Sequence, residues 1–264
     1  MQASTLTKTP ERSGRVAEYL DRIGDHGPLD VTAETLRRLH HAHLLAVPFE
    51  NLDIHLGRPI VLDLDALFDK VVRRRRGGFC YELNGLFGWL LGELGFDVTM
   101  IAARVFNARG ELGPEFDHMA LLVDLDRVWL ADVGFGASAR EPLLLDESEE
   151  QTSEGVVYSL ARDGEAWLMV GRDADGAKPQ YRFSPLARRL EEYEPMCRYH
   201  QTSPESHFTR KRVCSLATPD GRVTLSDTRL IVTRGTERTE RHIAGDAEYT
   251  ATLGEFFGIT LSAG

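Results

Sequence analysis

The strongest constraint on the fold of this chain is a change in hydrophobic periodicity near Gly95. Before this residue, apolar side chains recur every three to four positions, the spacing of one face of an amphipathic helix. After it, they fall in short, partly β-branched runs that are separated by turn signals such as Arg109-Gly110 and Asp163-Gly164. We therefore expect a helical N-terminal part followed by a β-rich part.

Four amphipathic segments make up the helical part. The first covers residues 16–23, and the second ends before Pro48, because a residue that precedes proline resists the α conformation. Asp63 is a suitable N-cap for the third. The fourth opens at Cys80 and stops at Gly95, a residue suited to a left-handed C-cap.

The β-rich part shows no alternation of strands with helices. Its strand-like segments are 98–106, 119–123, 128–133, 156–160 and 166–170. A parallel, doubly wound sheet is therefore disfavoured, and a barrel or sandwich fits better. The acidic stretch at 146–150 is most simply a solvated loop. Further strand-like segments at 213–216, 223–225 and 230–233, followed by a short helix from Asp246, indicate a small meander closed by a helix.

Charge and hydropathy narrow the classes of partner. The chain has 264 residues, with 31 Lys and Arg against 41 Asp and Glu, which gives a net charge of −10. An acidic chain is repelled by phosphate backbones, so nucleic acid is not expected as a partner. No apolar run approaches the roughly 18–20 residues of a membrane span, and residues 1–14 lack the apolar core of a signal peptide. We expect a cytoplasmic protein without a membrane partner.

The three cysteines are Cys80, Cys197 and Cys214. An odd number without a Cys-x-x-Cys pair disfavours both a disulfide framework and a structural zinc site. A small buried hydrophobic role suits Cys197 and Cys214. Cys80 differs because it opens a predicted helix directly after the Arg73-Arg74-Arg75-Arg76-Gly77-Gly78 run. The helix dipole and the arginines would both favour the thiolate, which is the nucleophilic form.

A nucleophilic cysteine needs a base, and the base needs an orienting group. His118 begins one apolar segment and Asp132 lies within the next. If the two segments form a hairpin centred near residue 125, His118 and Asp132 are cross-strand partners on one face. A buried Asp132 also needs a partner. The cluster of His40, His41 and His43 lacks supporting ligands and is expected on an exposed helix face rather than around a metal.

Four sequence blocks, in order, resemble those of the arylamine N-acetyltransferases. They are Val-Pro-Phe-Glu-Asn-Leu at 47–52, Arg-Gly-Gly-Phe-Cys at 76–80, Asp-Val-Gly-Phe-Gly at 132–136 and Ser-Pro-Glu-Ser-His-Phe at 203–208. The resemblance implies an α+β fold: a helical bundle in 1–95, an antiparallel β-barrel in 96–205 and an α/β lid in 206–264. It further implies a Cys-His-Asp core like that of cysteine proteases and transglutaminases, with Cys80, His118 and Asp132 as the triad.

The same resemblance implies the chemistry and its substrates. Acetyl-CoA would donate an acetyl group to Cys80, and an aromatic amine or hydrazine would then accept it, without a metal. Phe49, Phe79 and Tyr81 would line the acceptor pocket, and Phe135, Gly136 and Phe208 would border coenzyme A. The phosphate contacts and the oligomeric state are not assigned. Asp117, before the implied catalytic histidine, departs from the Thr or Ser that many members carry.

Three alternatives stay open at this point. One is an amide synthase that transfers a longer acyl or polyketide chain to an arylamine. Another is a thiol hydrolase or transglutaminase-like enzyme with the same triad. The third is a binding module that has lost its activity, which the intact set of Cys80, His118 and Asp132 argues against.

Overall fold

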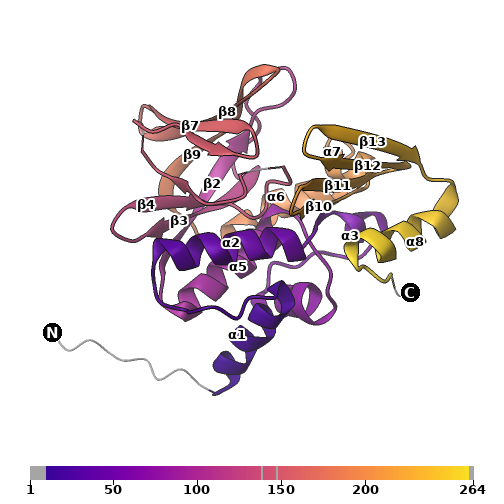
Figure 1. Cartoon of the computed structure of the whole chain (residues 1–264), viewed down its shortest axis with the longest axis horizontal. Coiled ribbons are helices and arrows are strands. Elements are labelled where there is room, and N and C mark those ends of the chain that lie inside the picture. The colour runs from indigo at the N-terminus through magenta and orange to yellow at the C-terminus, as the bar shows by residue number, and fades with distance from the viewer. Residues whose placement is uncertain (1–9, 138, 147, 262–264) are drawn as a thin grey trace.

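The computed structural model describes residues 10–137, 139–146 and 148–261. Residues 1–9 of the predicted bundle and 262–264 of the predicted lid lie outside the described residues, as does Glu147 of the predicted acidic loop. Figure 1 shows helices in the lower part of the molecule, a strongly curved sheet above them and a second sheet beside both. None of the helices in the described part of the chain is long and apolar enough to cross a bilayer.

The N-terminal part is helical, as the periodicity predicts. Its elements are α1 (Pro10–Ile23), α2 (Ala33–Ala46), α3 (Leu52–His55), α4 (Leu64–Phe68), a π-helical turn (Asp69–Arg73) and α5 (Cys80–Leu94). Asp63 caps α4 by accepting hydrogen bonds from the amides of Asp65 and Ala66, and Gly95 ends α5 with a φ of 99°. Both cap predictions are confirmed.

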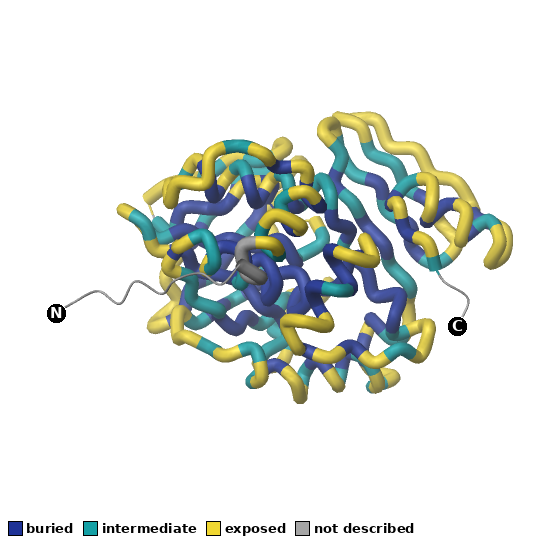
Figure 2. The backbone as a smooth tube through the Cα atoms, turned by 90° about the horizontal axis from the view of Figure 1, so that it is seen from below, coloured by how far each residue is buried: buried dark blue, intermediate teal, exposed yellow. Residues whose placement is uncertain are grey.

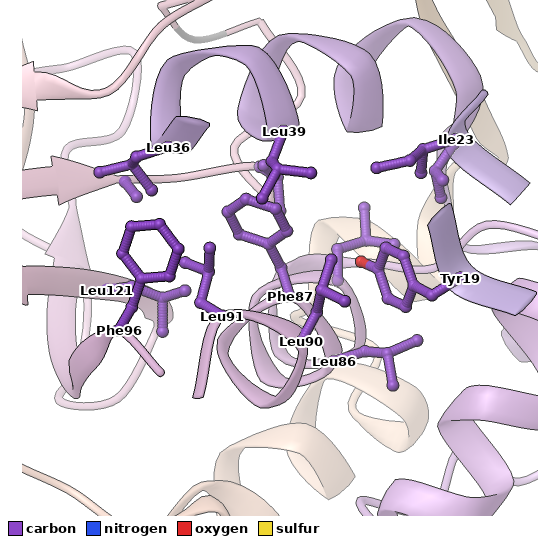
Figure 3. Packing of buried hydrophobic residues seen from close by; sticks show 14 of the residues in the cluster. Tyr19, Ile23, Leu36, Leu39, Leu86, Phe87, Leu90, Leu91, Phe96 and Leu121 are labelled. Carbon is purple, nitrogen blue, oxygen red and sulfur yellow. The ribbon is translucent and has the colours of Figure 1, made fainter. Parts of the chain in front are cut away.

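The main core lies between the helices and the curved sheet. Leu36 and Leu39 of α2 face Phe87 and Leu91 of α5 (Figure 3), and all four side chains are fully buried. Leu121, from the strand that underlies α5, joins the same cluster. Burial of this apolar surface fixes α5, and with it Cys80, on the sheet.

The curved sheet is antiparallel and runs in the order β5-β4-β3-β2-β9-β8-β7-β6. The strands are β2 (Asp97–Val105), β3 (His118–Asp124), β4 (Val128–Ala131), β5 (Leu143–Leu144), β6 (Gln151–Ser153), β7 (Val156–Asp163), β8 (Ala166–Asp173) and β9 (Gly176–Ala187). The Gln151 side chain joins the two outermost strands, donating to the Leu144 carbonyl at 2.9 Å and accepting from the Leu144 amide at 2.6 Å. The predicted antiparallel barrel is thus confirmed.

The second sheet holds β1 (Phe49–Glu50), β10 (Val213–Thr218), β11 (Gly221–Ser226), β12 (Arg229–Arg234) and β13 (Glu237–His242), in that order. β10, β11 and β12 form the predicted meander, β13 adds a fourth strand that was not predicted, and α8 (Gly245–Phe257) packs on this sheet. Exposure rises across the sheet from β10 to the fully exposed β13 (Figure 2). β1 comes from the helical part, so the first and last parts of the chain share a sheet.

A short helical connection links the two sheets. A 3₁₀ turn (Leu190–Tyr193) leads into α6 (Glu194–Thr202), and α7 (His207–Arg210) follows. Ser206 caps α7 by accepting from the Phe208 amide at 3.2 Å.

Candidate active site

Cys80 is the first residue of α5, and close backbone approaches fix its position. Glu82 accepts a hydrogen bond from the Phe79 amide at 3.1 Å and so caps the helix. A Cβ on Gly77 would lie 1.8 Å from the Pro48 carbonyl oxygen, and one on Gly134 would lie 2.7 Å from the Cys80 Cα. Glycine is required at both places because the backbones pass so close to each other.

A buried network of ion pairs anchors the segment before Cys80. Lys70 contacts Glu82 at 2.7 Å and Asp53 at 2.8 Å, and Arg76 contacts Glu50 at 2.7 Å and Asp53 at 3.0 Å. Burial raises the pKa of Asp53, but Lys70 and Arg76 outweigh it and hold the pKa below its usual value.

The same pairing corrects the expectation that the arginine run polarises the thiol. Arg76 is engaged by Glu50 and Asp53, Arg73 contacts Glu18 at 3.0 Å and Arg74 contacts Asp69 at 2.8 Å. These arginine charges are compensated by their own carboxylates.

His118 and Asp132 are in direct contact. His118 Nε2 lies 2.8 Å from Asp132 Oδ2, and both residues are buried. The carboxylate also accepts from Tyr181 Oη at 3.1 Å, Asn84 Nδ2 at 2.9 Å and the Gly134 amide at 3.0 Å. Burial raises the pKa of Asp132, yet His118 and these donors together hold it below its usual value. Asp132 is therefore ionised and keeps His118 Nδ1 as the nitrogen that can take a proton.

The route to this contact differs from the predicted hairpin register. β3 and β4 pair Leu121 with Ala131 and Leu122 with Leu130, and β4 ends before Asp132. His118 instead pairs with Ala103 of β2. The centre of the hairpin lies at residue 126 and not at the predicted residue 125. Asp132 therefore contacts His118 from the turn after β4 and is not its partner in the β-ladder.

Two supporting residues escaped the sequence reasoning. Asn84 donates to the Met119 carbonyl at 2.7 Å and accepts from the Val133 amide at 2.9 Å, in addition to its bond with Asp132. It follows Cys80 by four residues on α5, and this helical spacing is a signal that could have revealed it. His40 accepts from the Asp132 amide at 3.2 Å.

The expected exposed histidine face on α2 is wrong for two of its three residues. His40 and His43 are buried, and only His41 is exposed. His40 Nδ1 lies 3.1 Å from the Arg140 carbonyl, and His43 Nδ1 lies 2.9 Å from Tyr19 Oη. Burial lowers the pKa of His40 to about 4, so it is neutral at physiological pH.

The Cys80 thiol is buried, and burial raises its pKa well above the ordinary value. A hydrogen bond from the Met119 backbone opposes this shift, whereas the carboxylates of Asp117 and Asp132 add to it. Burial therefore opposes formation of the thiolate, and His118, which lines the same cavity, is a candidate base for the thiol proton.

A cavity of about 360 Å³ opens onto Cys80. Its lining residues come from both sheets and the connection between them: Phe49, Cys80, Val105, Asp117, His118, Gly134, Phe135, His207, Phe208, Lys211, Val213 and Ser226. Of the aromatic residues expected around the substrates, Phe49, Phe135 and Phe208 line the cavity. Gly136 lies behind Phe49, since a Cβ there would be 3.8 Å from its ring.

The structure places Phe79 and Tyr81 elsewhere. Both are fully buried in the core below the cavity, with ring centroids 5.0 Å apart, and neither is among the lining residues. Tyr81 Oη donates to the Phe116 carbonyl at 2.7 Å and thereby supports the start of β3.

Asp117 lines the cavity next to His118 and pairs with His200 of α6 at 3.2 Å. Cys197 and Cys214 are buried and are not among the lining residues. Within the described ranges, no group of three or more His, Cys, Asp or Glu side chains is placed to hold a metal ion.

Comparison with known proteins gives consistent matches. A family model described as N-acetyltransferase matches residues 32–264. Arylamine N-acetyltransferase, pineal gland isozyme NAT-3, of Gallus gallus is 33% identical, with 93% of this chain and 94% of that protein covered.

Solved structures are similar over the same length. The arylamine N-acetyltransferase from Salmonella typhimurium superposes with a TM-score of 0.87 at 32% identity, covering 93% of this chain and 91% of that chain. The Mycobacterium marinum arylamine N-acetyltransferase in complex with CoA gives 0.86 at 34% identity, with 92% of each chain covered.

Proposed function

The chain belongs to the arylamine N-acetyltransferase family, and from this we propose that it moves an acetyl group from acetyl-CoA to an aromatic amine or hydrazine through an acetyl-Cys80 intermediate. The observation that carries the proposal is the shared cavity. Cys80 and His118 both open into it, and His118 is paired with Asp132 at 2.8 Å. A thiol, a base and an orienting carboxylate are the parts that nucleophilic acyl transfer needs.

The first half-reaction uses the buried thiol. His118 Nδ1 takes the proton of Cys80, and the resulting imidazolium is stabilised by Asp132. The thiolate attacks the thioester carbonyl carbon, and the bond from that carbon to the CoA sulfur then breaks. CoA leaves with the proton from His118. The Cys80 amide, in the first turn of α5, is a suitable donor to the transient oxyanion because amides there lack an intrahelical partner.

The second half-reaction returns the enzyme to its starting state. The acceptor nitrogen attacks the acetyl-Cys80 carbonyl, His118 removes a proton from that nitrogen, and the bond to the Cys80 sulfur breaks. The sulfur recovers the proton, and the product is an amide or hydrazide. Because coenzyme A leaves before the acceptor attacks, the cavity holds the two substrates in turn and not together.

We also propose that residues 206–264 act as the lid of this cavity and that coenzyme A enters beneath it. His207, Phe208, Lys211, Val213 and Ser226 supply one wall, which supports this assignment. Phe135, Gly136 and Phe208 are proposed to border coenzyme A, and Phe49 the acceptor. Three free thiols are consistent with the reducing cytoplasm, where we place the protein.

Intact-mass analysis after incubation with acetyl-CoA tests the proposal. We expect one acetyl group on the wild-type chain and none on Cys80→Ala, whereas Cys197→Ala should acetylate like the wild type. Addition of an aniline or aryl hydrazine should remove the adduct and yield the N-acetyl product. A folded wild-type protein that gains no acetyl group would refute acetyl-CoA as the donor.

The same assay addresses the amide synthase alternative. Acylation by a long-chain thioester without acylation by acetyl-CoA would replace acetyl transfer by transfer of a longer chain. A wild-type chain that cleaves amide substrates without CoA would favour the thiol hydrolase.

A further inference from the structure

We propose that Asp117, held by His200, determines the charge of the aromatic amines that the site accepts, and that it disfavours acceptors bearing a negative group. The inference rests on the proposed function because it concerns the second substrate of that reaction. It assigns a specificity-determining role to a carboxylate that the acetyl-transfer steps do not use.

The backbone around Asp117 is fixed so that the carboxylate faces the cavity. Phe116, directly before it, has a φ of 61°, a left-handed conformation that is uncommon for a bulky residue. Tyr81 Oη donates to the carbonyls of Phe116 at 2.7 Å and Asp117 at 3.2 Å. The Asp117 side chain is 16% exposed and lines the cavity beside His118. Strain of this kind is retained where the surrounding contacts hold a functional geometry.

His200 contacts the Asp117 carboxylate and is not itself among the residues that line the cavity. Ser206 Oγ accepts from the Phe208 amide at 3.2 Å, so its hydroxyl proton is available to His200 Nδ1, which lies 3.1 Å away. His200 Nε2 lies 3.2 Å from Asp117 Oδ1. These contacts place the Asp117 carboxylate at the cavity wall.

Other charged groups around the cavity do not cancel this charge. His207 also lines the wall, and burial lowers its pKa, which favours its neutral form. Lys211 is exposed, at the solvent side of the lining. Asp117 is close enough to the reacting sulfur to contribute to the raised pKa of Cys80, after the larger effect of burial.

The remaining wall amplifies the effect of the carboxylate. Phe49, Val105, Phe135, Phe208 and Val213 are apolar lining residues. Charges separated by such low-dielectric surroundings interact more strongly than in water. An acceptor with a carboxylate on its ring is therefore repelled, whereas a neutral or cationic acceptor is not, and an added N–H donor could bind Asp117.

Two acceptors of nearly the same shape test the proposal: 4-aminobenzoate, which is an anion, and 4-aminobenzamide, which is neutral. The readout is the ratio of kcat/KM for the amide to kcat/KM for the acid, with acetyl-CoA saturating. Asp117→Asn removes the charge and keeps the shape, and we expect it to lower this ratio by at least about tenfold. Asp124→Asn, the same change at the exposed far end of β3, should leave the ratio unchanged.

Further variants separate specificity from structure. His200→Leu keeps the Asp117 carboxylate, so it should keep the wild-type preference even where it slows both acceptors, and loss of the preference in this variant would overturn the proposal. An equal loss for both acceptors in Asp117→Asn would also overturn it, because a purely structural role moves both rates together. Asp117→Ser provides the same test if the asparagine variant does not fold. If the proposed function itself is wrong, the wild type forms no acetyl-Cys80. If only the role of Asp117 is wrong, acetyl-Cys80 forms and the ratio stays unchanged in Asp117→Asn.

Discussion

At the scale of single residues, Asp132 is a buried carboxylate whose ionised form depends on the hydrogen bonds that it accepts. Four donors surround its carboxylate, and one of them is His118. Asp132→Asn would place an amide N–H against one of these donors and would remove the charge that stabilises the imidazolium. We expect acetylation of Cys80 to slow by about 10³-fold or more, in line with the loss of an orienting carboxylate in other triads.

Single-turnover formation of the acetyl-enzyme measures this effect. Asp126→Asn, an exposed change in the turn between β3 and β4, serves as the control and should keep the wild-type rate. A rate for Asp132→Asn within a few-fold of the wild type would show that His118 does not depend on this carboxylate.

The pH dependence of Cys80 alkylation reports how the thiolate forms. Burial raises the thiol pKa, and only the thiolate fraction of a thiol reacts, so without a base the alkylation of Cys80 should stay slow at pH values where a free cysteine, of pKa about 8.5, already reacts readily. In the wild type, transfer of the proton to His118 supplies thiolate at lower pH. We therefore expect iodoacetamide to modify wild-type Cys80 near neutral pH and His118→Gln only in strongly alkaline solution. Coincident profiles would remove His118 from the role of base.

The proposed catalytic residues could be predicted from the sequence, and their environment could not. Cys80 was identified by its place at a helix start, and His118 and Asp132 by their places in two apolar segments. The raised pKa of Cys80 and the neutralised arginines depend on burial and on carboxylates from distant segments. These long-range effects leave no local pattern in the sequence.

At the scale of elements, the contact between α5 and the turn after β4 joins Cys80 to Asp132. Gly134 permits it, because a Cβ there would lie 2.7 Å from both the Cys80 Cα and Asn84 Nδ2. Gly134→Ala must push the two elements apart, and a displacement on the order of 1 Å can cost about 10²-fold in rate. We expect kcat/KM to fall by about 10- to 100-fold while the fold is retained.

A second glycine of α5 provides the matched control. Gly92 has open space around its Cα. Gly92→Ala should leave the rate unchanged and raise the free energy of unfolding by up to about 1 kcal/mol, the difference in helix propensity. Equal activity of both alanine variants would mean that the close approach at Gly134 does not position the triad.

The buried ion pairs that anchor α5 yield a prediction of stability. Lys70→Met would leave Asp53 and Glu82 buried without their shared cation, and removal of one partner of a buried pair costs about 3–5 kcal/mol. The lowered pKa of Asp53 means that its carboxylate stabilises the fold above its unfolded value, about 3.9, and loses this effect as pH falls. The deficit of Lys70→Met in urea unfolding should thus be full from pH 7 down to about pH 4 and shrink only below that pH.

Lys178→Met controls for the loss of a lysine, because Lys178 is 56% exposed and lies about 4 Å from Asp173 and Asp175. Its free energy of unfolding should stay within about 0.5 kcal/mol of the wild type, as is usual for surface substitutions. A Lys70→Met deficit that does not vary with pH would trace the loss to packing rather than to charge.

Three strands, β9, β13 and β1, are not predicted from the sequence, and each has a physical reason. β9 lies in the middle of the barrel but contains Pro179 and Pro185, which are disfavoured in central strands. Register shifts opposite both prolines accommodate them. β13 is fully exposed, and so it carries no apolar alternation. β1 has only two residues and exists because β10 supplies its partner.

At the scale of the whole molecule, the division into helical, barrel and meander parts follows from periodicity, whereas the way in which the parts meet does not. The shared sheet of β1 and β10, and the cavity walls drawn from both sheets, are long-range contacts. The charge distribution is likewise a property of the folded chain. A protein of net charge −10 must attract a polyanionic donor, and the composition alone gives no location for the basic entrance.

The lining of the cavity indicates where that entrance lies. Lys211 is an exposed lining residue, and Arg210 and Arg212 flank it in the chain. Arg210 is the last residue of α7, and Lys211 and Arg212 follow it on the proposed lid, so the three residues bring positive charge to this part of the lining. Lys211→Glu therefore changes the charge by two units at the point where the phosphates of coenzyme A would enter.

We expect Lys211→Glu to raise the KM for acetyl-CoA by about 3- to 10-fold at low ionic strength, the range of one or two exposed charge contacts. Salt screens exposed charges, so the difference from the wild type should shrink between about 0.01 and 0.5 M salt. Lys178→Glu makes the same change in total charge on β9, away from the cavity lining, and tests whether net charge alone is responsible. If both variants raise KM equally, the whole-molecule field governs the encounter; a rise confined to Lys211→Glu places the entrance at the end of α7.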